Sequence, residues 1–145
     1  MNPVVHFEMP YDDRDRMAAF YARAFGWQIQ KLGPEMGDYA LATTVKDGDP
    51  VRQVPGAING GFFPRRADWP DQHPSVVIAV PDIRAAMDGV RAAGGEVLGE
   101  PMAIPGVGDY VSFRDPEGNR VSLLQPLLQP PVQPSMQPPA CRAGG

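Results

Sequence analysis

The sequence lacks features that several common classes of protein require. Its one cysteine, Cys141, cannot form a disulfide within the chain, which favours a reducing compartment. No apolar run approaches the roughly 20 residues that a membrane-spanning helix needs. Residues 1–10 lack the basic and apolar regions of a secretory signal peptide. We therefore expect a soluble, cytoplasmic protein that has no membrane partner.

Positive charge is also scarce. The 145 residues include 13 Lys and Arg against 17 Asp and Glu, which gives a net charge of -4 and a pI near 5.0. Nucleic-acid-binding domains need a basic patch, so this balance argues against a nucleic-acid partner. The GxSxG, CxxC, P-loop and HExxH patterns are absent as well, which leaves the mechanisms that depend on them without support.

The apolar pattern predicts the same order of elements twice. In each half an alternating strand leads to a helix that begins at an acidic cap and ends at glycine. Asp12 or Asp13 caps the first helix, and Asp82 caps the second. The first helix carries an apolar stripe that we expect to face the core, formed by Met17, Phe20, Tyr21, Ala24 and Phe25.

Three strands are predicted after each helix, at residues 27–30, 39–44 and 57–63, and again at 96–98 and within a hairpin at 107–125. Such a duplication determines the architecture. We predict an α+β fold in which two βαβββ modules, at about 3–64 and 75–126, form one curved mixed sheet around a cup, with the helices outside. Residues 127–145 are rich in proline and are predicted to be a disordered tail, either without a partner or acting as a PxxP-type ligand.

The predicted hairpin contains the turn Asp-Pro-Glu-Gly-Asn. Pro116 presets the φ of a type I turn, and Gly118 can take the left-handed conformation that follows. In the strand after the turn, Ser122 faces away from its neighbours Val121 and Leu123. The residue that lies opposite Ser122 therefore decides whether this strand can take part in a metal site.

Three segments of the chain resemble the vicinal oxygen chelate superfamily, which includes glyoxalase I, extradiol dioxygenases and bleomycin- or fosfomycin-resistance proteins. They are HFEMPYDDRDRMAAFYARAFGW at 6–27, VPDIRAAMDGVRAAGGEV at 80–97 and FRDPEGNRVSLLQP at 113–126. The likeness covers residues 4 to about 126 and is greatest with short glyoxalase-like proteins of bacteria. It implies paired βαβββ modules, a small-molecule ligand and a homodimer.

The resemblance also implies where a divalent metal ion would be bound, by side chains from the first and last strands of each module. The matching positions are His6, Ser75 and Ser122, and the fourth falls in the strand at 57–63, which contains no Asp, Glu or His. A serine hydroxyl is a poor, neutral ligand for Zn, Ni or Fe. We therefore predict that no metal cofactor is bound. The alternative is a divalent metal in a rearranged site, with the ligands His6, Glu8 and His73.

His6 and Glu8 are the candidate catalytic residues. An unperturbed imidazole titrates near neutrality, so His6 is either an acid/base group or a remnant of the metal site. Glu8, on the same face of the strand, is either a general base with a raised pKa or a carboxylate paired with Arg114 or Arg120. The candidate residues of the ligand pocket are Trp27, Tyr39, Asn59, Ser75, Tyr110 and Ser122.

Several of these pocket residues also allow a purely structural interpretation. Trp27 and Tyr39 could form an aromatic wall or could simply pack. Asn59, which precedes Gly60 and Gly61, could lie close to a ligand or mark a β-bulge. Tyr110 could reach the cup or pack in the core.

Two functions follow from this interpretation, and the sequence leaves open whether the protein is an enzyme. The first is a bleomycin-resistance-like protein with a degenerate metal site that sequesters or senses a small organic ligand. The second is a glyoxalase-type lyase or isomerase, or a dioxygenase, in which His6 and Glu8 transfer protons. A weaker third alternative is an interaction protein that acts through its proline-rich tail.

Overall fold

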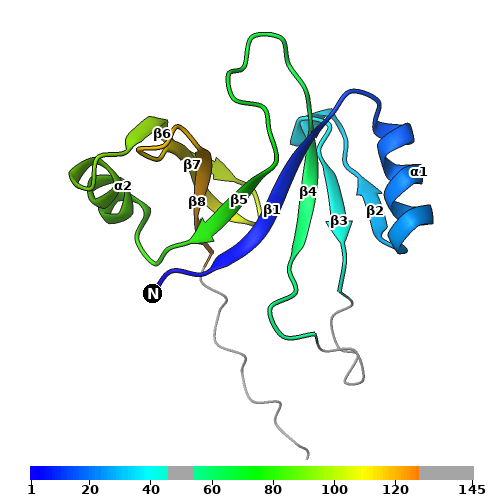
Figure 1. Ribbon diagram of the computed structural model, residues 1–145, viewed down its shortest axis with the longest axis horizontal. Helices are drawn as coiled ribbons and strands as arrows, with labels where there is room; N and C mark the ends of the chain where they lie inside the picture. The colour runs from blue at the N-terminus through cyan, green and yellow to red at the C-terminus, as the bar shows by residue number, and fades with distance from the viewer. Residues whose placement is uncertain (46–53, 128–145) are drawn as a thin grey trace, which may run out of the picture.

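The computed structural model describes residues 1–45 and 54–127 and has the predicted α+β architecture (Figure 1). Residues 128–145, which are all of the predicted tail except Leu127 and include Cys141, lie outside the described residues. In the described ranges no helix is long and apolar enough to cross a membrane. The elements, in chain order, are β1 Val4–Tyr11, α1 Arg14–Phe25, β2 Gln28–Lys31, η1 Pro34–Met36, β3 Ala40–Thr43, β4 Asn59–Pro64, β5 Ser75–Ala79, α2 Ile83–Ala92, β6 Glu96–Ile104, β7 Gly108–Arg114 and β8 Arg120–Pro126.

The strands form one mixed sheet in the order β2-β3-β4-β1-β5-β8-β7-β6. Each half contributes four strands and one α-helix, and the halves meet where β1 pairs antiparallel with β5. Within the halves, β1 runs parallel to β4 and β5 runs parallel to β8. Figure 1 shows α1 and α2 on opposite outer sides of the molecule, with the strands between them. The predicted pair of βαβββ modules is therefore confirmed.

Both long helices begin at the aspartates that the sequence indicates. The carboxylate of Asp13, rather than that of Asp12, accepts a hydrogen bond from the Arg16 backbone N–H at 2.9 Å. Asp82 accepts one from the Ala85 N–H at 3.0 Å in the same way. Each aspartate satisfies one of the backbone donors that the first turn of a helix leaves without a partner.

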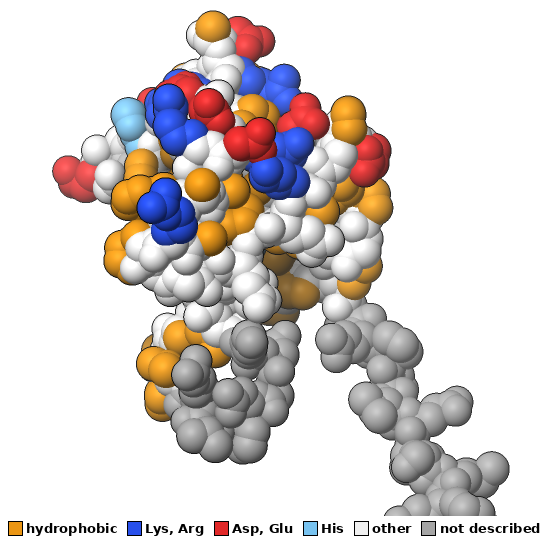
Figure 2. Space-filling view, turned by 90° about the vertical axis from the view of Figure 1, so that its right-hand side faces the viewer, with side chains coloured by type: hydrophobic (Ala, Val, Ile, Leu, Met, Phe, Trp, Pro, Cys, Tyr) orange, Lys and Arg blue, Asp and Glu red, His pale blue; other side chains and the backbone are white. Residues whose placement is uncertain are grey.

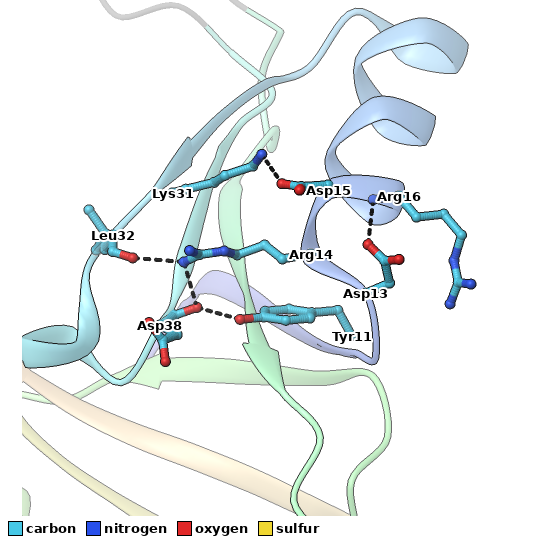
Figure 3. Close-up of polar contacts among 8 residues, drawn as sticks. All are labelled: Tyr11, Asp13, Arg14, Asp15, Arg16, Lys31, Leu32 and Asp38. Carbon is cyan, nitrogen blue, oxygen red and sulfur yellow. Dashed lines mark hydrogen bonds and ion pairs between the residues drawn. The ribbon is translucent and has the colours of Figure 1, made fainter.

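The start of α1 is tied to the loop between β2 and β3 (Figure 3). The Tyr11 hydroxyl donates to the Asp38 carbonyl at 2.6 Å, and Arg14 Nη1 donates to the carbonyls of Leu32 and Asp38 at 2.7 and 3.2 Å. Asp38 has a φ of +55°, which few residues other than glycine adopt. These bonds hold a strained turn in place and connect the first helix to the strands beyond it.

The hydrophobic core is divided between the two modules. Under α1 the buried residues are Tyr11, Ala40, Ala42 and Phe62. The rings of Tyr21 and Trp27, which stack with their centroids 4.8 Å apart, pack against them. Under α2 the buried residues are Val80, Ile83, Met87, Val111 and Leu123. Each helix therefore covers the half of the sheet that belongs to its own module.

The predicted apolar stripe of α1 is only partly correct. Met17 and Tyr21 pack on the core, but the side chains of Phe20 and Phe25 are 57% and 63% exposed. At 100° per residue, Phe20 and Phe25 lie roughly 80° and 60° to either side of the line between Met17 and Tyr21. They therefore flank the contact. Figure 2, which turns the side carrying α1 toward the viewer, shows hydrophobic side chains open to solvent there.

The predicted strand at 96–98 is too short, because β6 continues to Ile104. Its pairing with β7 is interrupted between Leu98 and Met102, where Gly99 has a φ of +90°. Pro101 lies in this irregular segment and donates no hydrogen bond. An edge strand tolerates both features, since one of its sides needs no partner.

We expect Tyr11→Phe to lower the free energy of unfolding by about 1 kcal/mol, because the Asp38 carbonyl loses the closer of its two side-chain donors and keeps only Arg14. Tyr21→Phe is the matched control, since the Tyr21 hydroxyl contacts only the Met9 sulfur, at 3.9 Å, and its loss should change stability by less than about 0.5 kcal/mol. Urea titration of both variants measures the difference. Equal losses would contradict the assigned role of Tyr11.

Candidate functional site

Alternation along β1 sends its side chains to two different faces of the sheet. Phe7 and Met9 pack under α1, on what we call the outer face. His6 and Glu8 point the other way, to what we call the inner face. Because neighbouring positions in a sheet share a face, the pairing of Val77 with both His6 and Ser122 places Ser122 on the inner face too.

The two modules meet at a hydrogen bond on this inner face. The Tyr110 hydroxyl, from β7, donates to Glu8 Oε1, from β1, at 2.8 Å. In the sheet β5 and β8 separate these strands, a spacing of about 14 Å across a flat sheet. Curvature and two long side chains are needed to close that distance. Residues 102 positions apart in the sequence thus form the centre of the candidate site.

A row of hydroxyl groups continues from Tyr110. Its oxygen lies 2.6 Å from Ser122 Oγ, which lies 3.1 Å from Ser112 Oγ. Arg120 Nη2 donates to Ser112 Oγ at 3.1 Å. Ser112 and Ser122 are only 6% and 2% exposed. Throughout the described residues, no buried polar side-chain atom lacks a hydrogen-bond partner, so this row is fully paired.

The turn at the end of the hairpin determines what lies opposite Ser122. The Asp115 carboxylate accepts hydrogen bonds from the backbone N–H groups of Glu117 and Asn119, each at 2.9 Å, and Gly118 takes a φ of +84°. The predicted turn is thereby confirmed. Its register pairs Ser112 with Ser122. A second hydroxyl, which is not a metal-binding side chain, therefore lies at the decisive position.

Burial raises the pKa of the Glu8 carboxyl group. The hydrogen bond from Tyr110 and the charge of Arg120 act in the opposite direction but are smaller effects. Burial, with the nearby Glu8 charge, also raises the pKa of Tyr110 to about 12. Tyr110 therefore keeps its proton at neutral pH and acts as a hydrogen-bond donor.

His6 belongs to a second polar pair on the inner face. Its Nε2 lies 2.9 Å from the Tyr39 hydroxyl, and burial lowers the pKa of His6. Burial and the charge of Glu8 raise the pKa of Tyr39, which indicates that this pair lies near Glu8. The Tyr39 ring lies where a β-carbon on Gly61 would be. A glycine at 61 is what makes room for the pair.

The side chains present do not fit a divalent metal ion. Within the described part of the chain, no three His, Cys, Asp or Glu side chains lie close enough together to hold one. His6 Nε2 is engaged with Tyr39, and Glu8 Oε1 with Tyr110. His73 is exposed in the segment before β5. The rearranged site of His6, Glu8 and His73 is therefore wrong, and a transition metal would find too few ligands here.

Trp27 and Asn59 do not belong to the hydrogen-bonded groups at Glu8 and His6, although Trp27 lines a groove together with Ser75. Trp27 packs on the outer face, where it lines an apolar groove of about 610 Å³ that contains no titratable side chain. Asn59 Oδ1 accepts from the backbone N–H groups of Thr44 and Val45, at 2.8 and 3.1 Å, and so holds the end of β3. We place the candidate chemistry at Glu8 and not in this groove, because the polar side chains that line the groove are limited to the hydroxyls of Thr44 and Ser75.

Three alternative interpretations need correction. The register of β4 is continuous through Gly60 and Gly61, so the suggested bulge is wrong, and the Phe7 and Tyr39 rings lie over these two glycines. Arg114 does not pair with Glu8, because it is bound to Asp71 at 2.6 Å. Arg120, the other suggested partner, contributes charge but donates its hydrogen bond to Ser112. Ser75 pairs with Glu8 along the backbone.

Sequence analysis missed Ser112 and the bond that Arg120 makes to it. A signal was available in the turn. Arg114 pairs with Arg120 on its two sides, and counting two residues outward from each places Ser112 opposite Ser122. Ser112 also lies two positions from Tyr110, on the same face of its strand. The hydrogen bond between Tyr110 and Glu8 could not be found in this way, since it depends on how the two modules approach each other.

Comparison with known proteins supports the fold and adds relatives. A family model described as the Glyoxalase/Bleomycin resistance protein/Dioxygenase superfamily matches residues 4–123. A protein of Vibrio parahaemolyticus named probable lactoylglutathione lyase is 27% identical over 124 residues, 84% of this chain and 89% of the relative. The glyoxylase-designated protein CFP32 of Mycobacterium bovis is 42% identical over 120 residues, but the match covers only 42% of its length and 82% of this chain.

Solved structures with the same fold include methylmalonyl-CoA epimerases. One, in complex with methylmalonyl-CoA and NH4+, superimposes with a TM-score of 0.65 at 18% identity over 88% of this chain and 96% of that chain. Another, from Mycobacterium tuberculosis, has a TM-score of 0.63 at 15% identity over 86% and 88%. Identities this low establish a shared fold and nothing about the ligand.

We expect Gly61→Ala to destabilise the protein by about 1–3 kcal/mol, because the added methyl group must displace the Tyr39 ring and break its bond to His6. Gly89→Ala is the control. Gly89 is exposed in α2 with no neighbour within 4 Å of an added β-carbon, so alanine there should stabilise the helix by up to about 1 kcal/mol. Denaturant unfolding measures both changes, and losses of equal size would refute the close contact at Gly61.

The raised pKa of Glu8 predicts a pH dependence of stability. Folded protein binds this proton more tightly than unfolded protein, so the stability that Glu8 contributes is present below its ordinary pKa of 4.5 and is lost as pH rises through the folded-state value. His6 acts oppositely, because its lowered pKa costs stability as pH falls below 6.5.

Glu8→Gln isolates the first effect. The free energy of unfolding of the variant, relative to the unmodified protein, should increase between pH 4.5 and 8, by about 1.4 kcal/mol for each pH unit between the folded and unfolded pKa of Glu8. Urea unfolding at a series of pH values provides the measurement. A constant difference across this range would mean that Glu8 is not desolvated.

Proposed function

The chain belongs to the Glyoxalase/Bleomycin resistance protein/Dioxygenase superfamily, and we propose that it binds a small organic molecule on the inner face of its sheet, against Glu8. The ligand would lie among the polar groups that converge there from both modules, of which Tyr39 and Tyr110 are the largest. In this proposal no metal ion takes part in binding, because the available side chains do not form a set of ligands.

The observation that carries the proposal is the environment of Glu8. Its carboxyl group is largely desolvated, yet its hydrogen-bond partner is a neutral hydroxyl, and no ion pair involves it among the described residues. A buried carboxylate without a paired cation costs free energy of folding. Carboxyl groups with a perturbed pKa are found at functional sites more often than elsewhere in proteins, which favours a ligand-binding role for Glu8.

Proton transfer within a bound ligand is the second candidate function. A carboxyl group whose pKa is raised toward neutrality is a more effective general base, and burial acts on Glu8 in that direction. The Tyr110 hydroxyl supplies a neutral donor beside it. Relatives named as lactoylglutathione lyases, with which this chain shares most of its length, also favour a lyase or isomerase of this kind.

The predicted homodimer remains part of the proposal. Strands β2 and β6 are the edges of the sheet, and each presents unpaired backbone groups that a second copy could cover. The sequestering, sensing and catalytic alternatives do not depend on this assembly.

Thermal unfolding with a panel of small carbonyl compounds and flat aromatic compounds tests binding. A ligand that binds at 100 times its Kd should stabilise the folded protein by about 2.7 kcal/mol. Metal content before and after dialysis against a chelator provides a second measurement. A stoichiometric ion that is present before dialysis and removed by the chelator would contradict the metal-free proposal.

Glu8→Gln then separates the two functions. For a hit with an acidic C–H bond, deuterium incorporation from D2O, followed by proton NMR, reports transfer. If Glu8 is the base, the variant should still be stabilised by the ligand but should exchange at least about 100-fold more slowly. Asp88→Asn, an exposed change on α2, is the control. Unchanged exchange in Glu8→Gln would exclude Glu8 as the base.

A further inference from the structure

We infer that Arg120 is a positioning residue for Glu8 and that it acts through the three hydroxyl groups of Ser112, Ser122 and Tyr110. These five side chains form a continuous hydrogen-bonded chain across the inner face. The inference rests on the proposed function only in treating Glu8 as the group that meets the ligand. The chain itself can be measured in the free protein.

The direction of this chain is determined at its two ends. An arginine side chain can only donate hydrogen bonds, so the Ser112 oxygen must accept from Arg120 at 3.1 Å. An ionised carboxylate can only accept them, so the single Tyr110 hydroxyl proton is directed to Glu8 at 2.8 Å. Both end bonds involve a charged group and are therefore stronger than bonds between neutral partners.

The inner bonds then have one remaining arrangement. Because the Tyr110 hydroxyl donates its one hydrogen bond to Glu8, its oxygen must accept a hydrogen bond from Ser122 across 2.6 Å. Ser122, having donated, must accept from Ser112 across 3.1 Å. Each hydroxyl donates once and accepts once. The positive end of the chain is Arg120, and every bond is polarised toward Glu8.

This arrangement decides which oxygen of Glu8 carries a proton. A proton on Oε1 would donate toward Tyr110 and reverse the inner bonds, but Arg120 would still donate to Ser112. The Ser112 proton would then lose its acceptor, Ser122, in a buried site, which is costly. Protonation of Oε2 leaves every bond unchanged. The chain therefore reserves Oε1 as an acceptor and leaves Oε2 to exchange protons or to receive a donor from the ligand.

The charged and titratable groups around Glu8 come from three strands and one connecting segment. Tyr110 lies on β7, Arg120 on β8 and His6 on β1, and Tyr39 lies just before β3. Of these only Arg120 is permanently charged, and it can affect Glu8 through space as well as through the chain. The two routes differ in one respect. Removal of a serine hydroxyl interrupts the route through the hydrogen-bonded chain and leaves the effect through space in place.

A double-mutant cycle separates the routes. The pKa of Glu8 is measured by carbon-13 NMR of its side-chain carboxyl group, identified by its absence in Glu8→Gln. Ser122→Ala should raise this pKa by about half a pH unit, because the ionised form loses its polarised donor chain. Arg120→Gln should raise it as well. In the Ser122→Ala background, Arg120→Gln should have a clearly smaller effect than it has alone.

Controls distinguish this role from a structural one. Ser122→Thr keeps the hydroxyl and should keep the original pKa, and Asp88→Asn, an exposed change on α2, should not change it. If Ser122→Ala does not fold, Ser112→Ala interrupts the same chain one bond nearer Arg120. Additive effects of the serine and arginine changes, or no effect of the serine change, would overturn the inference. Either result would leave the proposal of ligand binding at Glu8 untouched.

Discussion

The antiparallel pairing of β1 with β5 is the contact on which the rest of the structure depends. Each module has its own core, one under α1 and one under α2, so neither core holds the two halves together. The pairing joins them and sets Glu8 opposite Ser75 at the centre of the sheet. From there Glu8 can reach Tyr110, which the other module supplies. The candidate site is thus a product of module assembly and not of either module alone.

Small residues decide what the inner face can contain. Gly61 and Gly60 leave room for the Tyr39 ring on one face of β4 and for the Phe7 ring on the other. The consequence is that two aromatic residues from outside β4 occupy space that its own side chains would fill. On the inner face this brings a phenol to His6. The same strand therefore serves packing on one side and polar chemistry on the other.

Patterns of short range predicted much of this molecule. The duplicated helices, their aspartate caps and the turn at Asp115 follow from local rules, and all three are observed. For Trp27 the sequence left an aromatic wall and simple packing open, and the structure packs its ring under α1 at the rim of an apolar groove. The bond between Tyr110 and Glu8 could not be predicted, since it depends on the curvature of the sheet and not on spacing along the chain.

Serines at two of the positions where the resemblance implies metal ligands would have a positive consequence as well as a negative one. Two buried hydroxyls cannot attract a divalent ion, but each can donate one hydrogen bond and accept another. They lie between Arg120, which can only donate, and Glu8, which accepts when ionised. Every hydrogen bond in the row therefore points from Arg120 toward Glu8. A metal ion would neutralise Glu8 by direct charge. In the proposed arrangement the hydroxyl row stabilises the carboxylate at one oxygen and leaves the other available, as the proposed proton transfer would require.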